Sequence, residues 1–333
     1  QGQMQVGDVT AGGAAGVDDH NLCAALSAGL GQALRDHFAR VMAHRKAKVP
    51  FDRFESASIV SDGLRLHLDV IAAGPDCPTL VFVPGTSVYG LIFGDFLAAM
   101  ADRGVNVVSV DPRGYGRSEG RRGDYSIPWL VADARAAVRY ARERFGGPIH
   151  VCGSSQGGIV AFYLAATDED LAGAICHNAA DLADTANANL TDHPLIAKML
   201  KPLVLGLARL RPQTEINVGK YYALLSRGDD KIKQWLAADP LTLKVITLRA
   251  LASLSSTPLD QPVEKISTPI LMLHGSRDNM FPQAFIERLY ERLNCEKTLQ
   301  LYPDVGHFLV TDHAERVATD VVGWIQSRTA AAS

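Results

Sequence analysis

The sequence of 333 residues lacks the features that mark several large classes of protein. Its 33 Lys and Arg residues and 36 Asp and Glu residues give a formal net charge of −3, so it has no basic excess with which to bind nucleic acid. Its five cysteines are scattered and include no Cys-x-x-Cys pair. This pattern predicts reduced thiols, no metal site and a cytoplasmic location.

The sequence also has no uninterrupted apolar run long enough to cross a membrane. Residues 77–94 and 145–167 contain no Asp, Glu, Lys or Arg, but Gly and Pro interrupt both stretches. Each stretch therefore predicts a buried strand, a loop and the start of a helix rather than a membrane span. Residues 1–19 have neither a basic start nor an apolar centre, and this predicts that no signal peptide is present.

What the sequence does contain suggests four parts. Residues 1–20 are rich in Gly, Ala, Gln and Asp without periodicity, which predicts a flexible tail. Residues 21–50 repeat apolar side chains every three or four positions, which predicts an amphipathic helix that packs on the main domain or on a second subunit. We expect one α/β core domain, formed by residues 51–180 and 263–333. Residues 181–262 show helical patterns and no convincing strand, and we expect them to form a helical cap. A homodimer through the helix or the cap is a further expectation.

Strands and helices alternate through the core, which predicts a mostly parallel eight-stranded sheet with helices on both faces. Ser61-Asp62-Gly63 joins the first two strand-like runs and predicts an antiparallel hairpin at the sheet edge. The predicted strands are 56–60, 64–71, 79–83, 105–110, 148–152, 171–176, 268–275 and 297–302. The predicted helices of the core are 91–103, 128–145, 159–166, 282–293 and 312–327, and those of the cap are 195–210, 221–236 and 241–254.

The most informative stretch is Gly153-Ser154-Ser155-Gln156-Gly157, between a predicted strand and a predicted helix. Gly-x-Ser-x-Gly in this context predicts a sharp strand-to-helix turn that presents the Ser155 hydroxyl as a nucleophile. The same turn directs the Gln156 amide, at the helix N-terminus, toward negative charge that develops beside the serine.

A serine hydroxyl needs a base to accept its proton and an acid to orient that base, and this turn requires them in the chain order Ser, Asp, His. Asp278 follows a predicted strand and precedes a helix that begins with Pro282, so it is the predicted acid. His307 lies between the last predicted strand and the last predicted helix, and it is the predicted base among ten histidines. The alternatives for the acid are Asp181, Asp184 and Asp304.

A second amide donor for an oxyanion is predicted in the loop that begins with Pro84-Gly85-Thr86, where the Thr86 amide would face the Gln156 amide. The next strand is followed by a charged loop. In that loop we expect structural contacts near the turn from Asp111 and Arg113. We expect Arg121 and Arg122 to form a patch that is exposed to solvent.

These motifs together resemble those of α/β-hydrolases, in the capped group of lipases, esterases and serine aminopeptidases that includes monoacylglycerol lipases. The resemblance covers about residues 54–326. It implies the α/β-hydrolase fold and a serine hydrolase that works through an acyl-enzyme, without metal or organic cofactor. One departure from the pattern is Pro84, because the oxyanion loop of many relatives reads His-Gly. The matching motifs are Pro84-Gly85-Thr86, residues 111–118, residues 153–158, residues 275–278 and Gly306-His307.

The resulting hypothesis is the cleavage of a small-molecule carboxylic ester with a medium-sized apolar acyl or alcohol group. The apolar stretch 195–210 is expected to line the pocket for that group. One set of alternatives keeps the same residues but cleaves an amide, a peptide or a carbon–carbon bond. Another is a non-catalytic ligand-binding protein on the same fold, and a third is a lipase that uses the N-terminal helix on a membrane surface.

Overall fold

The computed structural model describes residues 31–168, 170–184, 194–219 and 239–332. The predicted tail, the first ten residues of the predicted N-terminal helix and the predicted helix at 221–236 lie outside the described residues.

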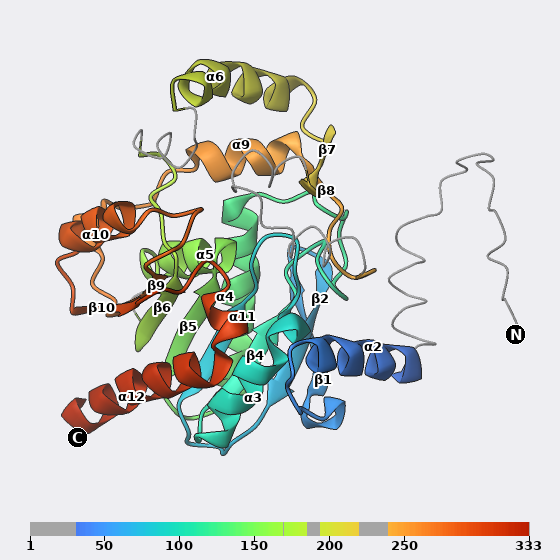
Figure 1. The fold of residues 1–333 in the computed structure, drawn as a ribbon, viewed down its shortest axis with the longest axis vertical. Helices are drawn as coiled ribbons and strands as arrows, with labels where there is room; N and C mark the ends of the chain where they lie inside the picture. The colour runs from blue at the N-terminus through green and yellow to red at the C-terminus, as the bar shows by residue number, and fades with distance from the viewer. Residues whose placement is uncertain (1–30, 169, 185–193, 220–238, 333) are drawn as a thin grey trace, which may run out of the picture.

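An eight-stranded sheet forms the centre of the molecule (Figure 1), in the order β1-β2-β4-β3-β5-β6-β9-β10. β2 runs antiparallel to both of its neighbours, and every other adjacent pair is parallel. The predicted edge hairpin and the mostly parallel sheet are therefore confirmed. The strands are β1 (Glu55–Ser61), β2 (Leu64–Ile71), β3 (Thr79–Val83), β4 (Asn106–Val110), β5 (Ile149–Ser154), β6 (Gly173–His177), β9 (Ile270–Gly275) and β10 (Lys297–Tyr302).

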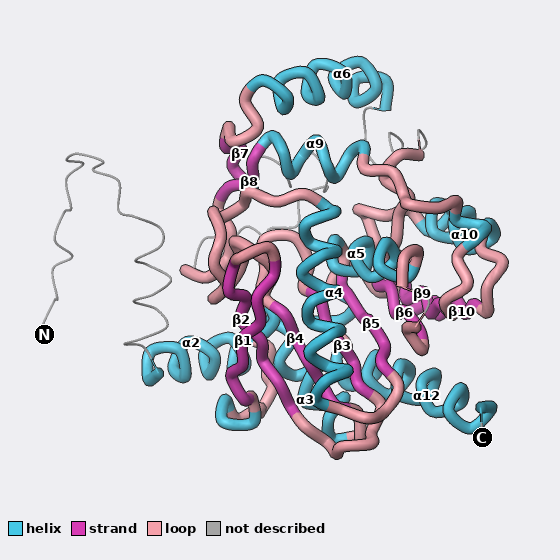
Figure 2. The backbone as a smooth tube through the Cα atoms, turned by 180° about the vertical axis from the view of Figure 1, so that it is seen from behind, coloured by secondary structure: helices cyan, strands magenta, loops and turns pink. Residues whose placement is uncertain are grey.

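Helices cover both faces of this sheet, and each face has its own hydrophobic core. Successive side chains of a strand point to opposite faces, so Leu80 and Phe82 of β3 join one core while Val81 and Val83 join the other. Figure 1 looks onto the face with α3, α11 and α12, and Figure 2 looks onto the face with α4. The helices of the core are α2 (Gly31–His44), η1 (Phe51–Arg53), η2 (Gly90–Phe93), α3 (Gly94–Asp102), α4 (Ile127–Arg144), α5 (Gln156–Ala165), η4 (Val263–Lys265), α10 (Gln283–Arg292), α11 (Leu309–Asp312) and α12 (Ala314–Ala332).

The described part of the predicted cap contains two helices, α6 (Pro194–Leu210) and α9 (Leu248–Ser256), which stack at one end of the molecule (Figure 1). It also contains two strands, β7 (Glu215–Asn217) and β8 (Val245–Thr247), which pair antiparallel. The prediction that this insertion has no strand is therefore wrong. Strands of three residues are too short to produce a recognisable alternation of apolar and polar side chains.

Two predicted helices differ from the structure by more than a shift of a few residues at their ends. The predicted helix 241–254 begins only at Leu248, where the Thr247 hydroxyl accepts a hydrogen bond from the Ala250 amide and caps the first turn. The predicted helix 312–327 is two helices, α11 and α12. Within the described ranges, no helix combines the length and the apolar character that crossing a membrane requires.

Candidate active site

Ser155 is the single residue between β5 and α5, and it has the strained backbone angles φ 56° and ψ −119°. Its amide donates to the His177 carbonyl oxygen (2.8 Å), which ties the turn to the neighbouring strand. A Cβ atom on Gly157 would lie 2.0 Å from the Val83 carbonyl oxygen, and one on Gly153 would lie 2.1 Å from the Gly157 backbone. The glycines of the motif are therefore required because the turn packs directly against adjacent backbone.

Ser155, His307 and Asp278 lie together although 152 positions separate the serine from the histidine. His307 Nε2 is 3.1 Å from Ser155 Oγ, and His307 Nδ1 is 2.8 Å from Asp278 Oδ2. The three side chains follow β5, β9 and β10, whose carboxyl ends meet at one edge of the sheet. Since a carboxylate only accepts hydrogen bonds, Nδ1 carries a proton, and in the neutral form of the ring the lone pair of Nε2 faces the serine hydroxyl.

The Asp278 carboxylate is held by several donors. Its Oδ1 accepts from the amides of Met280 (2.8 Å) and Phe281 (3.0 Å), and its Oδ2 accepts from the Asn178 side-chain amide (3.0 Å). Burial raises the pKa of Asp278, but the charge and hydrogen bond of His307 and the Phe281 amide outweigh it and hold the pKa well below its usual value. The carboxylate therefore stays ionised and can orient His307 at neutral pH.

The three alternative acids bind arginine side chains instead. Asp304 forms an exposed ion pair with Arg277 (2.6 Å), and Asp184 forms one with Arg288 (2.9 Å). The remaining alternative, Asp181, lies 3.7 Å from Arg292.

The loop predicted to supply the second oxyanion donor lies directly against the serine. A Cβ atom on Gly85 would lie 3.4 Å from Ser155 Cβ, and the Thr86 hydroxyl donates to Gln156 Oε1 (2.7 Å). Gln156 is the first residue of α5, so its amide is one of those for which a helix offers no internal acceptor. The geometry therefore brings both predicted donor residues beside Ser155.

Two tyrosines that the sequence did not indicate hold the Gln156 side chain. Tyr125 donates its hydroxyl hydrogen to Gln156 Oε1 (2.9 Å), and Gln156 Nε2 donates to the Tyr115 hydroxyl (3.0 Å). Both phenol rings are buried and lie 5.4 Å apart between centroids. The start of α5 is thus fixed by two side chains from the loop between β4 and α4.

Asn178 is the closest neighbour of the site that sequence reasoning missed. It follows β6 with a φ of 65°, in the left-handed region that Asn tolerates better than most residues. Its Nδ2 donates to Asp278 and lies 3.3 Å from His307 Nδ1, while its Oδ1 lies 3.1 Å from Nδ1 of the buried His274. The available signal was its position at the carboxyl end of a parallel strand, the same signal that selected Asp278.

A second serine–histidine contact lies behind the first. Ser154 Oγ is 2.9 Å from His177 Nδ1, and both residues are buried. Burial, together with the nearby His307, lowers the pKa of His177 to about 3, so its ring is neutral under ordinary conditions. Ser154 differs from Ser155 in that its side chain belongs to the sheet interior rather than to the turn.

His177, Asp278 and His307 also offer metal-ligand atoms within 4.8 Å of one another. However, the relevant atoms of His307 and Asp278 are hydrogen-bonded directly to each other at 2.8 Å. This donor set is therefore arranged for proton transfer rather than around an ion.

The charged loop after β4 makes the structural contacts that its sequence predicts. Asp111 accepts from the amides of Gly90 (2.9 Å) and Arg117 (3.0 Å), and Arg113 forms an ion pair with the buried Asp133 (2.7 Å). These contacts hold the loop against the start of η2.

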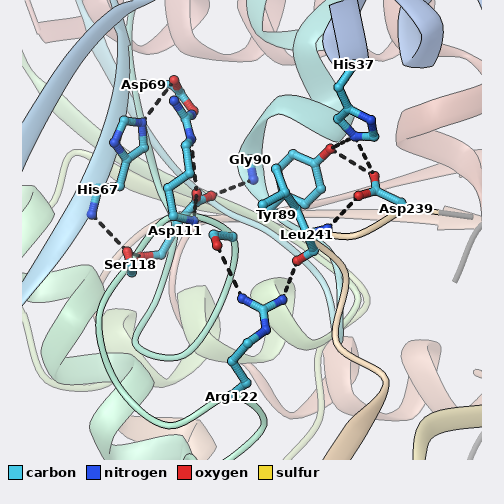
Figure 3. A network of polar contacts seen from close by, with 12 residues as sticks. His37, His67, Asp69, Tyr89, Gly90, Asp111, Ser118, Arg122, Asp239 and Leu241 are labelled. Atoms are coloured by element: carbon cyan, nitrogen blue, oxygen red, sulfur yellow. Dashed lines mark hydrogen bonds and ion pairs between the residues drawn. The ribbon is translucent and has the colours of Figure 1, made fainter. Parts of the chain in front are cut away.

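Of the two arginines predicted to be solvated, Arg121 is partly exposed and pairs with Glu215 of β7 (3.0 Å). The prediction is wrong for Arg122, because its guanidinium donates to the Leu241 carbonyl oxygen (2.6 Å) and to the Gly116 carbonyl oxygen (3.2 Å) (Figure 3). Both side chains therefore join the core to the insertion.

The expectation that residues 195–210 line a pocket is wrong for most of the described side chains. Six large apolar side chains of α6 are exposed, among them Met199 at 79% and Leu210 at 80%. Helix α6 packs on α9, and its less exposed side chains include Val204, Leu205 and Ala208. The other exposed members are Leu195, Leu200, Leu203 and Leu207.

Known proteins share this sequence pattern and this fold. A family model described as serine aminopeptidase, S33, matches residues 74–314. A monoacylglycerol lipase of Mycolicibacterium smegmatis is 28% identical over 232 residues, which cover 67% of this chain and 79% of the relative. A bifunctional esterase/perhydrolase of Acinetobacter calcoaceticus is 25% identical over 262 residues, which cover 76% of this chain and 94% of the relative.

Among solved structures, a monoacylglycerol lipase of Paleococcus ferrophilus superposes with a TM-score of 0.63 at 22% identity. The superposition covers 83% of this chain and 99% of that chain. At this level of identity the likeness shows a shared fold.

Proposed function

The chain belongs to the serine aminopeptidase S33 family and has the α/β-hydrolase fold, and from this premise we propose that it hydrolyses carboxylic esters with apolar acyl or alcohol groups. Relatives with esterase and lipase names support the ester as the bond that is cleaved. We also propose that residues 181–262 act as a cap over the site.

The proposed reaction has two halves. Ser155 Oγ attacks the ester carbonyl carbon as His307 Nε2 accepts its proton, and the amides of Thr86 and Gln156 stabilise the negative oxygen. The bond to the alcohol then breaks as His307 returns the proton to the leaving oxygen, which leaves an acyl-enzyme. In the second half His307 removes a proton from water, the hydroxide attacks the acyl carbon, and Ser155 departs with the proton.

The observation that carries the proposal is the continuous chain of contacts from Asp278 Oδ2 through His307 to Ser155 Oγ, at 2.8 Å and 3.1 Å. These distances are within reach for proton transfer. The strained turn at Ser155 adds support, because backbone strain of this kind is characteristic of functional sites.

The two adjacent serines provide a matched test of this proposal. Ser155→Ala is expected to lower kcat/KM for p-nitrophenyl butyrate about 10⁴-fold or more, because it removes the nucleophile. Ser154→Ala removes a buried hydroxyl whose partner is His177 rather than His307. This variant is expected to keep kcat/KM within about tenfold of wild type. Undiminished hydrolysis by Ser155→Ala would refute the proposal.

Aminopeptidase action, the alternative that the family name suggests, needs a carboxylate available to bind a free amine. In and beside the described part of the proposed cap, four carboxylates already pair with cationic or imidazole side chains. These four are Asp181, Asp184, Glu215 and Asp239. These pairs occupy the four carboxylates, while Asp260 of the same part is exposed, and a panel that compares aminoacyl p-nitroanilides with p-nitrophenyl esters tests ester against amide cleavage.

A further inference from the structure

Helix α2 and the residue that follows it contact segments that border the candidate site at two points, although they lie outside the region that the family model matches. Two buried apolar side chains, Phe38 and Met42, fasten it to the start of α3. A Cβ atom on Gly94 would lie 2.8 Å from the Phe38 ring, so the helix and α3 pack with no space between them. The polar side chains on either side of this apolar anchor then reach different segments of the site.

At the first contact point, His37 of α2 meets Tyr89 and Asp239 (Figure 3). His37 Nε2 lies 2.9 Å from the Tyr89 hydroxyl oxygen and 3.1 Å from Asp239 Oδ2, while the Tyr89 hydroxyl donates to the same carboxylate oxygen (2.9 Å). Because Tyr89 has already donated its only hydrogen, His37 Nε2 faces two acceptors and must carry a proton. The single Nε2 hydrogen is therefore shared between the Tyr89 hydroxyl oxygen and the Asp239 carboxylate, and the three groups contact one another pairwise.

This set joins two segments that are remote in the sequence and border the candidate oxyanion loop. Tyr89 ends the loop that begins with Pro84, and it is 1% exposed. Asp239 lies within the insertion, and four residues later the Leu243 amide donates to the Ser87 carbonyl oxygen (2.9 Å). His37 therefore holds the far end of the loop whose near end, at Thr86, contacts Gln156.

At the second contact point, the Arg45 guanidinium reaches three acceptors just beyond the end of α2. It donates to the carbonyl oxygens of Ile92 and Thr311 and forms an ion pair with Asp95 (2.7 Å), and its side chain is only 4% exposed. Thr311 follows His307 by four residues and lies in α11. One buried cation thereby links the segment after the oxyanion loop to the segment after the candidate base.

We propose that α2 is a positioning element of the active site, in which His37 and Arg45 hold the oxyanion loop and the His307 segment in register with Ser155. This inference rests on the proposed esterase function. Neither side chain touches the reacting atoms, so both are positioning residues and act on the rate through the geometry of other groups.

The first test compares His37→Leu with His37→Gln in the full chain. Leu removes the donor to Tyr89 and Asp239, whereas the Gln side-chain amide can donate from nearly the same position. We expect His37→Leu to lower kcat for p-nitrophenyl butyrate about tenfold with KM within twofold, which is less than the 10²–10³-fold cost of losing a whole oxyanion donor. We expect His37→Gln to recover most of the rate.

Arg40→Ala provides the matched control, because Arg40 is an exposed residue of the same helix, and it is expected to keep wild-type kcat and KM. A His37→Leu protein with kcat within twofold of wild type overturns the inference. So does an equal loss of rate in His37→Leu and His37→Gln. Labelling of the wild-type enzyme by a fluorophosphonate separates the two proposals, since a chain that is not labelled at all fails the proposed function instead.

A double-mutant cycle with Tyr89→Phe distinguishes positioning through this network from a general loss of stability. If His37 acts through Tyr89, adding His37→Leu to Tyr89→Phe lowers kcat by a clearly smaller factor than His37→Leu alone does, because only the contact of His37 with Asp239 is left to lose. Fully multiplicative effects of the two substitutions on kcat, with melting temperatures equal within 2 °C, would contradict the inference.

Discussion

Among single residues, Asn178 makes more contacts with the candidate site than its place in the sequence indicates. Its side-chain nitrogen donates to the Asp278 carboxylate, which orients His307, and its side-chain oxygen contacts the buried His274. A hydrogen bond to a charged group contributes about 1.5–3 kcal/mol, so its loss should be visible in the rate.

Asn178→Ala is therefore expected to lower kcat for p-nitrophenyl butyrate about ten- to a hundredfold with little change in KM, because Asp278 loses one of its donors. Steady-state kinetics measures this effect. Asn294→Ala is the control, since Asn294 is exposed and donates to a backbone carbonyl oxygen away from the site. Equal kcat values for the Asn178 and Asn294 variants would show that Asn178 does not support the carboxylate.

The sequence identified Ser155, Asp278 and His307 because each lies in a short motif at the end of a strand, in an order that one fold requires. Their proximity was predictable from that order, while their catalytic roles stay a prediction. Tyr115 and Tyr125 could not be selected in the same way, and Asn178 shares the position after a strand but lies in no such motif. Their contacts join segments 31 to 100 positions apart, and no local spacing records such a contact.

At the scale of the helix and the strand, the turn at Ser155 depends on the absence of side chains. Gly157 lets α5 start against the end of β3. A Cβ atom at this position would lie 2.0 Å from the Val83 carbonyl oxygen, and the backbone would have to shift to relieve the clash. Gly323 of α12 is the opposite case, because it is exposed and a Cβ atom there would meet no atom within 4 Å.

Gly157→Ala is accordingly expected to destabilise the protein by about 2 kcal/mol or more and to abolish ester hydrolysis, because the turn must shift. Gly323→Ala is expected to stabilise it by about 0.5–1 kcal/mol, since alanine loses less backbone entropy in a helix. Urea unfolding measures both values. A Gly157→Ala protein with wild-type stability and activity would contradict the description of the turn.

Helix α6 shows why amphipathic patterns predict an element better than its orientation. Its apolar spacing correctly predicted a helix, but six of its large apolar side chains are exposed although the helix packs on α9. Periodicity identifies two different sides of a helix, and only tertiary contacts decide which side is buried. The pocket expected from the same pattern was wrong for that reason.

At the scale of the whole molecule, the sheet brings the residues of the candidate site together. Parallel strands place their carboxyl ends at one edge, so loops that follow β3, β5, β6, β9 and β10 meet there. The sequence predicted this architecture well, because the buried strands read as continuous apolar runs bounded by Gly and Pro. It did not predict how α2 and the insertion dock on that edge, since such contacts depend on single side chains such as His37 and Arg122.

The central claim is that Ser155, activated by His307, is the nucleophile. The most direct measurement is reaction of the full chain with a fluorophosphonate, followed by mass spectrometry of its peptides with fragmentation that resolves Ser154 from Ser155. One adduct per chain on the Ser155 oxygen, and none in the His307→Ala variant over the same time, is the predicted result. No adduct on the wild-type chain, or an adduct on Ser154 or another residue, would contradict the account.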